Sequence, residues 1–140
     1  MKNKNYWLIK TEPEVWSWKQ QVKSGKKGAE WNGVRNFQAA RNLKRMQMKD
    51  KCFFYHTGKI KSIVGIAEVI KEAFLDKSDK TGKFVAVNVR SLYPLKREVS
   101  LYEIKKNKVF RDFSLVKQSR LSVMKVDLKY WKKICKMGRV

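Results

Sequence analysis

Apolar residues recur along this chain in short runs that polar turns separate. Continuous or alternating apolar runs, rich in β-branched and aromatic side chains, predict strands at residues 6–10, 52–55, 63–70, 84–92 and 122–126. In the fourth run, Val85, Val87 and Val89 alternate and mark one face of the strand. Turn sequences at residues 57–58 and 79–82 mark two of the boundaries between these strands.

Polar capping residues predict where the short helices begin. Ser17 with Gln20, and Ser100 with Glu103, have the spacing of a capping box, in which each side chain bonds to the other residue's backbone N–H. They predict helices that end near residues 25 and 108. Asp127 is expected to cap a last helix, which ends at residue 138.

A longer helix is predicted over residues 36–48, because Ala39, Leu43 and Met46 recur at helical intervals. Residues 26–33 show neither the helical nor the strand period of apolar residues and are predicted to be loop. Strands separated by both turns and helices indicate an α+β fold around a curved, mixed sheet. No repeat or linker composition divides the chain, so we expect one domain over residues 1–140.

The composition allows a globular core, because 43% of the 140 residues are hydrophobic. No run of about 18 apolar residues is present, so we expect no transmembrane helix and no membrane partner. The apolar run at residues 6–9 is too short for a signal peptide. We therefore expect a cytoplasmic protein associated with the nucleoid, or a nuclear one in a eukaryotic cell.

The formal net charge of +22 makes a polyanionic partner plausible. Lysine supplies most of this charge, and lysine also accumulates on solvated surfaces that bind nothing. The charge therefore describes solubility and association rate first, and it indicates binding only where a specific pocket exists.

The residue types do not indicate an enzyme. The lone histidine, His56, follows Cys52 by four positions, which on a strand is about 13 Å and too far for a hydrogen bond. With Cys135 distant in sequence, these residues do not make a zinc site. A phosphate-binding glycine loop and a carboxylate cluster are also missing from the sequence. We expect no cofactor and no metal.

Three polar or aromatic segments are candidates for binding. In residues 31–42 a tryptophan precedes Arg, Asn and Gln side chains, which suits a nucleobase, although a Trp beside a glycine is also common in cores. Tyr55 and His56 end an apolar strand and are either pocket residues or a core tyrosine and a surface imidazole. Residues 118–122 are either fixed hydrogen-bond donors or an ordinary loop.

Five segments of the chain match, in the same order, the segments of a known family. They are residues 6–13, 31–39, 54–58, 63–69 and 115–123, which read YWLIKTEP, WNGVRNFQA, FYHTG, IVGIAEV and LVKQSRLSV. In them the chain resembles the EVE domain family. The resemblance implies a PUA-like curved mixed sheet, or pseudo-barrel, with flanking short helices. It also implies a reader of modified bases, particularly modified cytosine in DNA, with RNA as an alternative partner.

By position, the resemblance implies a pocket at the end of the first strand, along residues 31–36, at the end of the strand 52–55 and in a closing loop. Its expected base-binding residues are Lys10, Thr11, Trp31, Val34, Arg35, Asn36, Tyr55, His56, Gln118, Ser119, Arg120, Leu121 and Ser122. Many family members have Ser in place of Thr11, which keeps the hydroxyl. Many also have Arg where this chain has Ala40.

On this basis we expect a base to leave its helix and enter the pocket. Trp31 or Tyr55 would stack on it, and Asn36 or Ser119 would bond to its Watson–Crick edge. Val34 and Leu121 would contact a methyl or hydroxymethyl group, and the expected phosphate ligands are Arg35, Arg41 and Arg120.

We expect the protein to act as a monomer. Three alternatives remain open: a nucleic-acid-binding module without base specificity, a pocket for a free nucleotide or other small anion, and a hydrolase that depends on His56.

Overall fold

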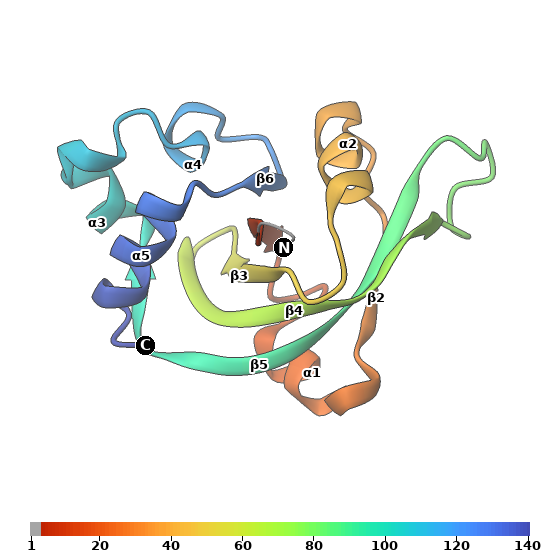
Figure 1. The fold of residues 1–140 in the computed structure, drawn as a ribbon, viewed down its shortest axis with the longest axis horizontal. Helices are drawn as coiled ribbons and strands as arrows, with labels where there is room; N and C mark the ends of the chain where they lie inside the picture. Colours follow the sequence, from red (N-terminus) through yellow and green to blue (C-terminus); the bar gives the residue numbers. More distant parts are fainter. Residues whose placement is uncertain (1–3) are drawn as a thin grey trace.

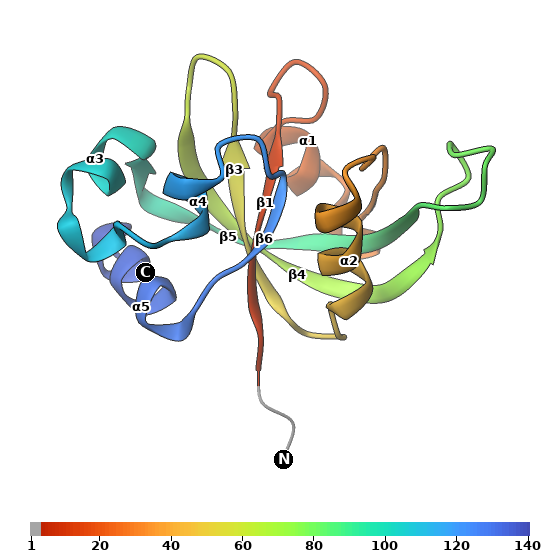
Figure 2. The ribbon, with the colours of Figure 1, turned by 90° about the horizontal axis from the view of Figure 1, so that it is seen from above.

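A six-stranded mixed sheet forms the centre of the computed structural model, which describes residues 4–140. The strand order is β2-β5-β4-β3-β1-β6, and β1 runs parallel to β3 while the other pairs are antiparallel. The long strands β4 and β5 curve strongly, so the sheet curls around its own core (Figures 1 and 2). The strands are β1 (Tyr6–Thr11), β2 (Ala29–Trp31), β3 (Lys51–His56), β4 (Ser62–Leu75), β5 (Val85–Ser100) and β6 (Val123–Lys125).

Short helices flank the sheet. In Figure 1, α3, α4 and α5 lie together at one end, α2 lies towards the other end, and α1 lies beneath β5. The helices are α1 (Trp18–Lys23), α2 (Phe37–Arg45), α3 (Leu101–Lys106), α4 (Ser114–Lys117) and α5 (Leu128–Met137), with 3₁₀ turns η1 (Gly25–Lys27) and η2 (Lys108–Phe110). The predicted α+β class with a curved mixed sheet is confirmed. No helix between residues 4 and 140 has the length and apolar character needed to cross a bilayer.

Both predicted capping boxes are present, at Ser17 and at Ser100. The prediction for Asp127 is half right, because the residue precedes α5 but its side chain caps no backbone N–H. The helix expected over 36–48 is shorter. Asn36 is its N-cap, and Met46 already has extended backbone angles.

The prediction that residues 26–33 are all loop is wrong. They contain η1 and β2, which pairs with β5 in the register Ala29 to Val89 and Trp31 to Val87. A strand of three residues is too short to show a period of two, so only its pairing with β5 defines it. Strand β5 also extends past the predicted end and through Pro94, where shifts in the β4–β5 register interrupt regular pairing.

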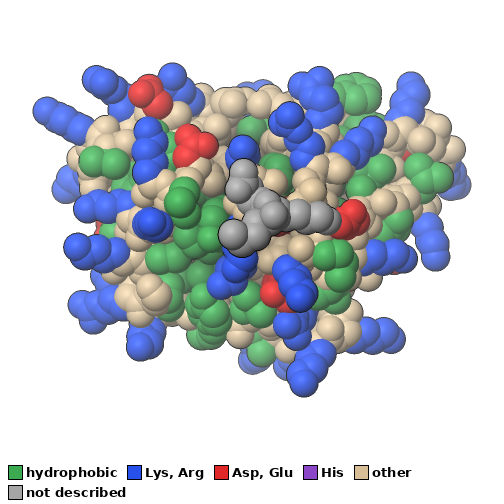
Figure 3. All heavy atoms as spheres, in the orientation of Figure 1, with side chains coloured by type: hydrophobic (Ala, Val, Ile, Leu, Met, Phe, Trp, Pro, Cys, Tyr) green, Lys and Arg blue, Asp and Glu red, His purple; other side chains and the backbone are tan. Residues whose placement is uncertain are grey.

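The core is aromatic, and the visible surface is basic. Trp131 of α5 stacks on Phe53 at 3.9 Å between ring centroids, which joins the C-terminal helix to the middle of the sheet. Lys and Arg side chains are scattered around the whole face drawn in Figure 3 instead of forming one patch. On this face the net charge therefore provides a diffuse attraction for anions and does not by itself define a binding site.

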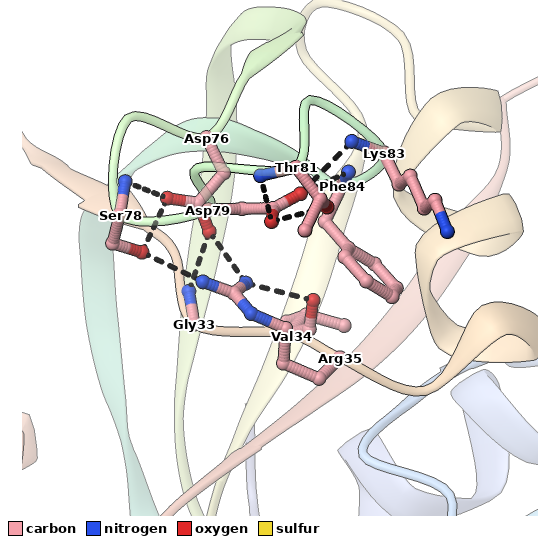
Figure 4. A network of polar contacts seen from close by, with 9 residues as sticks. All are labelled: Gly33, Val34, Arg35, Asp76, Ser78, Asp79, Thr81, Lys83 and Phe84. Atoms are coloured by element: carbon pink, nitrogen blue, oxygen red, sulfur yellow. Dashed lines mark hydrogen bonds and ion pairs between the residues drawn. The ribbon is translucent and has the colours of Figure 1, made fainter.

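A buried carboxylate joins the loop after β2 to the turn between β4 and β5 (Figure 4). One oxygen of Asp76 accepts hydrogen bonds from the Gly33 backbone N–H at 2.8 Å and from Arg35 Nη1 at 3.0 Å. The other oxygen accepts from the Ser78 backbone N–H at 2.8 Å and from its hydroxyl at 2.6 Å. Arg35 Nη2 also donates to the Ser78 hydroxyl at 2.9 Å. Residues 33–35 are thereby fixed to the β4–β5 turn.

These contacts change the acidity of Asp76. Burial alone would raise the pKa of this carboxyl, but hydrogen bonds from Ser78, Gly33 and Arg35 favour the charged form more strongly and hold the pKa well below its ordinary value. The unfolded chain loses these bonds, so ionised Asp76 stabilises the folded state.

We predict that Asp76→Asn lowers the free energy of unfolding by about 1–3 kcal/mol at pH 7, because an amide cannot accept from donors on both sides. The matched control is Asp112→Asn, whose exposed carboxylate pairs with Lys117 at 3.3 Å and should contribute no more than about 1 kcal/mol. Urea denaturation measures both. Equal losses in the two variants would contradict the role given to Asp76.

The effect of Asp76→Asn on the free energy of unfolding should also depend on pH. The folded pKa of Asp76 lies below the unfolded value of about 3.9, so its contribution is complete above that value and is lost as the pH falls towards the folded pKa. Hydrogen bonds led by that from Thr81 also lower the pKa of Asp79, to about 2, and this adds acid sensitivity to both proteins. The stability difference between wild type and Asp76→Asn should therefore shrink below about pH 4. A constant difference down to pH 2 would be the contrary result.

Candidate nucleic-acid interface

A cavity of about 530 Å³ lies between the end of β1, the segment that follows it, strand β2 and the loop after β2. This volume is in the range of small-molecule pockets, about 300–1,000 Å³. We call it the base cavity. Its lining residues are Lys10, Thr11, Val15, Trp16, Ala29, Glu30, Trp31, Asn32, Gly33, Val34, Arg35 and Ser122.

Six of the thirteen residues predicted from the sequence meet at this cavity: Lys10, Thr11, Trp31, Val34, Arg35 and Ser122. Sequence reasoning missed the other six, which are Val15, Trp16, Ala29, Glu30, Asn32 and Gly33. Ala29 and Glu30 belong to β2, which no local pattern marks, while Asn32 and Gly33 lie within the segment 31–36 that was expected at the pocket. Trp16 had one usable signal, since a hydrophobic residue directly before an N-cap often packs against the helix and so takes a fixed position at its start.

The two tryptophans of the cavity differ in exposure. Trp31 is only 7% exposed and packs edge-on against Phe54 at 5.5 Å. Trp16 is half-buried, and its indole N–H donates to Gln21 Oε1 at 2.8 Å. Gln21 is fully buried and donates in turn to the Val89 carbonyl at 3.0 Å. Trp16 is therefore the more accessible ring, and its orientation is fixed through α1 to β5.

The end of β1 connects the cavity to the closing loop. The Lys10 backbone N–H donates to the Ser122 carbonyl at 2.9 Å, and its ammonium donates to the Ser119 carbonyl at 3.0 Å. Burial lowers the pKa of this lysine. The Thr11 hydroxyl donates to the Trp16 carbonyl at 3.0 Å, which holds the segment after β1 in place.

Arg35 lines the cavity, but both of its terminal nitrogens already donate to protein oxygens. They bond to Asp76, Ser78 and the Val34 carbonyl, and the guanidinium carbon lies 5.4 Å from the centre of the Phe84 ring. In this arrangement Arg35 acts as a brace for the cavity wall. Arg41, the other predicted phosphate ligand on this side, is exposed on α2 and outside the base cavity.

A second hollow of about 290 Å³ collects most of the remaining predicted residues. The Asn36 side-chain oxygen points to the start of α2 and accepts from the Ala39 backbone N–H at 2.9 Å, so it is used as a helix cap. Leu121 is 4% exposed. The lining residues of this hollow are Asn36, Gln38, Lys117, Gln118, Ser119, Arg120 and Leu121.

Tyr55 and His56 do not line the base cavity. Tyr55 lines a third cavity, which shares the lining residue Lys10 with the base cavity and contains no residue of β2. His56 is 8% exposed, and its Nε2 accepts from the Trp18 backbone N–H at 3.0 Å. Burial lowers the pKa of His56, which keeps the imidazole neutral and able to accept this bond. The histidine is thus satisfied, as one alternative held, but it is buried rather than on the surface.

The two cysteines and the possible metal ligands can be assessed directly. Burial raises the pKa of the Cys52 thiol far above its ordinary value, so this cysteine is not a thiolate nucleophile. Cys135 is also a free thiol with a pKa raised by burial. Among residues 4–140 there is no group of three His, Cys, Asp or Glu side chains that could hold a metal ion.

Solved structures share this fold. A Rhodopseudomonas palustris protein determined by NMR is 47% identical, with a TM-score of 0.91 over 96% of this chain and 93% of that one. The human THYN1 protein, solved in complex with DNA that contains 5-methylcytosine, is 25% identical, with a TM-score of 0.90 over 97% and 98% of the two chains. A yeast YTH domain from Zygosaccharomyces rouxii shares the fold alone, at 19% identity and a TM-score of 0.60, with 100% and 87% of the two chains covered.

Curated sequences agree with the structural match. Mouse thymocyte nuclear protein 1 is 33% identical in an alignment 125 residues long that covers 72% of this chain. The match covers 55% of the mouse protein, so the chain corresponds to just over half the length of that relative. The EVE domain model matches residues 5–137. Together with the curled mixed sheet and its cavity, these matches show that the chain belongs to the EVE domain family.

Proposed function

We propose that this protein binds nucleic acid and holds one modified base in the base cavity, with modified cytosine in DNA as the first candidate and RNA as the second. The observation that carries the proposal is the cavity itself, which has two indole rings and several polar side chains in its lining. The complex of the human THYN1 protein with 5-methylcytosine-containing DNA supports cytosine as the base.

A base that enters this cavity must first leave its helix, because the lining lies between β1 and β2 and cannot reach into a duplex. Unstacking costs a few kcal/mol. Stacking on an aromatic ring returns about 1–3 kcal/mol per base. We assign this stacking to Trp16 in preference to Trp31, because Trp31 is 7% exposed and its ring packs on Phe54.

Glu30 and Asn32 are the side chains best suited to bond the base edge. Both are exposed, line the cavity and make no side-chain hydrogen bond within residues 4–140. A carboxylate accepts well from the N4 amino group of cytosine. Asn36, expected from the sequence to bond this edge, is less suitable because its oxygen already caps α2.

The apolar contact for a methyl group would come from Val15 and Val34, which line the cavity, whereas Leu121 lines the second hollow. One methyl-sized contact contributes about 1 kcal/mol, or about fivefold in affinity. Discrimination by this contact alone is therefore modest. Any selectivity above about fivefold would have to come from polar contacts to the base.

The direct test is a titration of one single-stranded oligonucleotide carrying cytosine, 5-methylcytosine or 5-hydroxymethylcytosine, and of the corresponding nucleosides, at two salt concentrations. We expect a methylated strand to bind about fivefold more tightly than the unmodified strand at both concentrations. Affinity for all strands should fall with salt. Equal affinity for modified and unmodified strands would contradict base reading and favour a nucleic-acid-binding module without base specificity. If the nucleosides bind as tightly as the strands, the ligand of the cavity is instead a free nucleotide or nucleoside.

The stacking role of Trp16 can be separated from its role in the fold. We predict that Trp16→Ala weakens oligonucleotide binding by about 5- to 150-fold. Trp16→Phe is the matched control, since it also loses the bond to Gln21 but keeps a ring, and it should retain most of the affinity. Trp31→Ala should instead cost about 3–5 kcal/mol of stability, as for a core aromatic. Equal affinities of Trp16→Ala and Trp16→Phe would rule out stacking on this residue.

A further inference from the structure

The third cavity has a lining unlike that of the base cavity. It measures about 280 Å³ and lies where the ends of β1 and β3 meet the start of α3. We call it the lysine cavity. The polar side chains that line it are three lysines and three hydroxyl groups: Lys10, Lys61, Lys105, Tyr55, Thr57 and Ser119.

The charge in the lysine cavity is of one sign. No carboxylate lines it. Lys61 and Lys105 are exposed, and within residues 4–140 neither forms an ion pair. The Lys10 ammonium lies 5.6 Å from the centre of the Tyr55 ring and donates to the Ser119 carbonyl, which leaves further donor positions on the same nitrogen. Three cations around a small concave surface favour an anion.

Tyr55 adds an unused donor. The residue is 3% exposed, and its hydroxyl makes no hydrogen bond to any part of the chain that the structure describes; this oxygen is the part of the side chain that faces the cavity and remains open to solvent. Burial raises the pKa of Tyr55 to about 12, so the hydroxyl remains protonated at physiological pH. A protonated hydroxyl that faces a cavity can donate to a ligand in place of water, and phosphate oxygens are strong acceptors.

The lysine cavity adjoins the base cavity through Lys10, which lines both. Ser119 similarly lines the lysine cavity and the second hollow. A nucleotide has its base and its phosphate at opposite ends of one sugar, so two cavities that share the lining residue Lys10 are suited to the two ends of one nucleotide.

We infer that the lysine cavity binds a backbone phosphate of the nucleic-acid strand, next to the base held in the base cavity. This rests on the proposed function and adds the second contact point of the nucleotide. It gives the phosphate role to Lys10, Lys61, Lys105 and the Tyr55 hydroxyl, and not to Arg35, whose guanidinium braces the loop after β2.

The test combines a double variant, Lys61→Gln with Lys105→Gln, and an oligonucleotide in which one phosphate beside the modified base is replaced by an uncharged methylphosphonate. We expect the double variant to bind the normal strand on the order of tenfold more weakly. Its plot of log affinity against log salt should be shallower by about 0.7, as for one phosphate of a single strand. Methylphosphonate substitution should weaken wild type to a similar extent and weaken the double variant much less, because only Lys10 and the Tyr55 hydroxyl then remain to contact the phosphate.

The matched control is Lys132→Gln with Lys136→Gln, which removes the same charge from two exposed lysines of α5 outside the three cavities. This control should stay sensitive to methylphosphonate as wild type does. Tyr55→Phe removes only the hydroxyl and should lower affinity for the normal strand without lowering the melting temperature. If the methylphosphonate penalty is the same in wild type and in Lys61→Gln with Lys105→Gln, the phosphate assignment is wrong.

Two further readouts separate this inference from the proposed function. The ratio of affinities for methylated and unmethylated strands should be the same in the double variant as in wild type, because the lysines do not touch the base. A ratio of one in wild type would refute base reading while the phosphate test still stands. Conversely, if cytidine 5′-monophosphate or inorganic phosphate binds wild type as tightly as the strand does and loses this affinity in the double variant, the cavity takes a free phosphate, and the strand assignment is overturned.

Discussion

The parallel pairing of β1 with β3 is the constraint on which the candidate site depends. Parallel neighbours need a long crossover, and here residues 12–50 make it, with α1, β2 and α2 along the way. The crossover provides most of the base-cavity wall, from Val15 to Arg35. Because parallel strands end at the same edge of a sheet, the pairing also sets Lys10 beside Tyr55. The candidate binding residues therefore lie together at one edge although they are far apart in the sequence.

A crossover of this length would be a poor cavity wall if it were free to move, and three fixed points hold it. Gln21 accepts from the Trp16 indole and donates to the Val89 carbonyl of β5. The Thr11 hydroxyl, at the end of β1, donates to the Trp16 carbonyl. Asp76 holds residues 33–35 against the β4–β5 turn. Each of these three connections ends on a strand of the sheet or on one of its turns. Such preorganisation lowers the conformational entropy that a ligand must remove on binding.

Local features of the fold could be predicted from the sequence, but which distant side chains meet at the site could be predicted only in part. Capping boxes and apolar runs depend on residues close in sequence, so the helix starts at Ser17 and Ser100 and the main strands were found. Strand β2 exists only through its pairing with β5, and no local pattern marks it. Asn36 and Arg35 have the right chemistry for a ligand, but the fold uses their polar atoms as a cap and a brace. Only the three-dimensional contacts reveal which polar side chains remain free.

The distribution of charge between the cavities argues for an oriented nucleotide. In a chain of net charge +22, a carboxylate at Glu30 weakens the attraction for phosphate at the base cavity, where two indoles also line the wall. The lysine cavity on the other side of Lys10 has three ammonium groups in its lining and no carboxylate. Diffuse basic charge brings a strand to the surface in any orientation. The contrast between the two cavities favours the base on the side of Glu30 and the phosphate on the side of Lys61 and Lys105, so contacts at short range, rather than the net charge, would set the orientation.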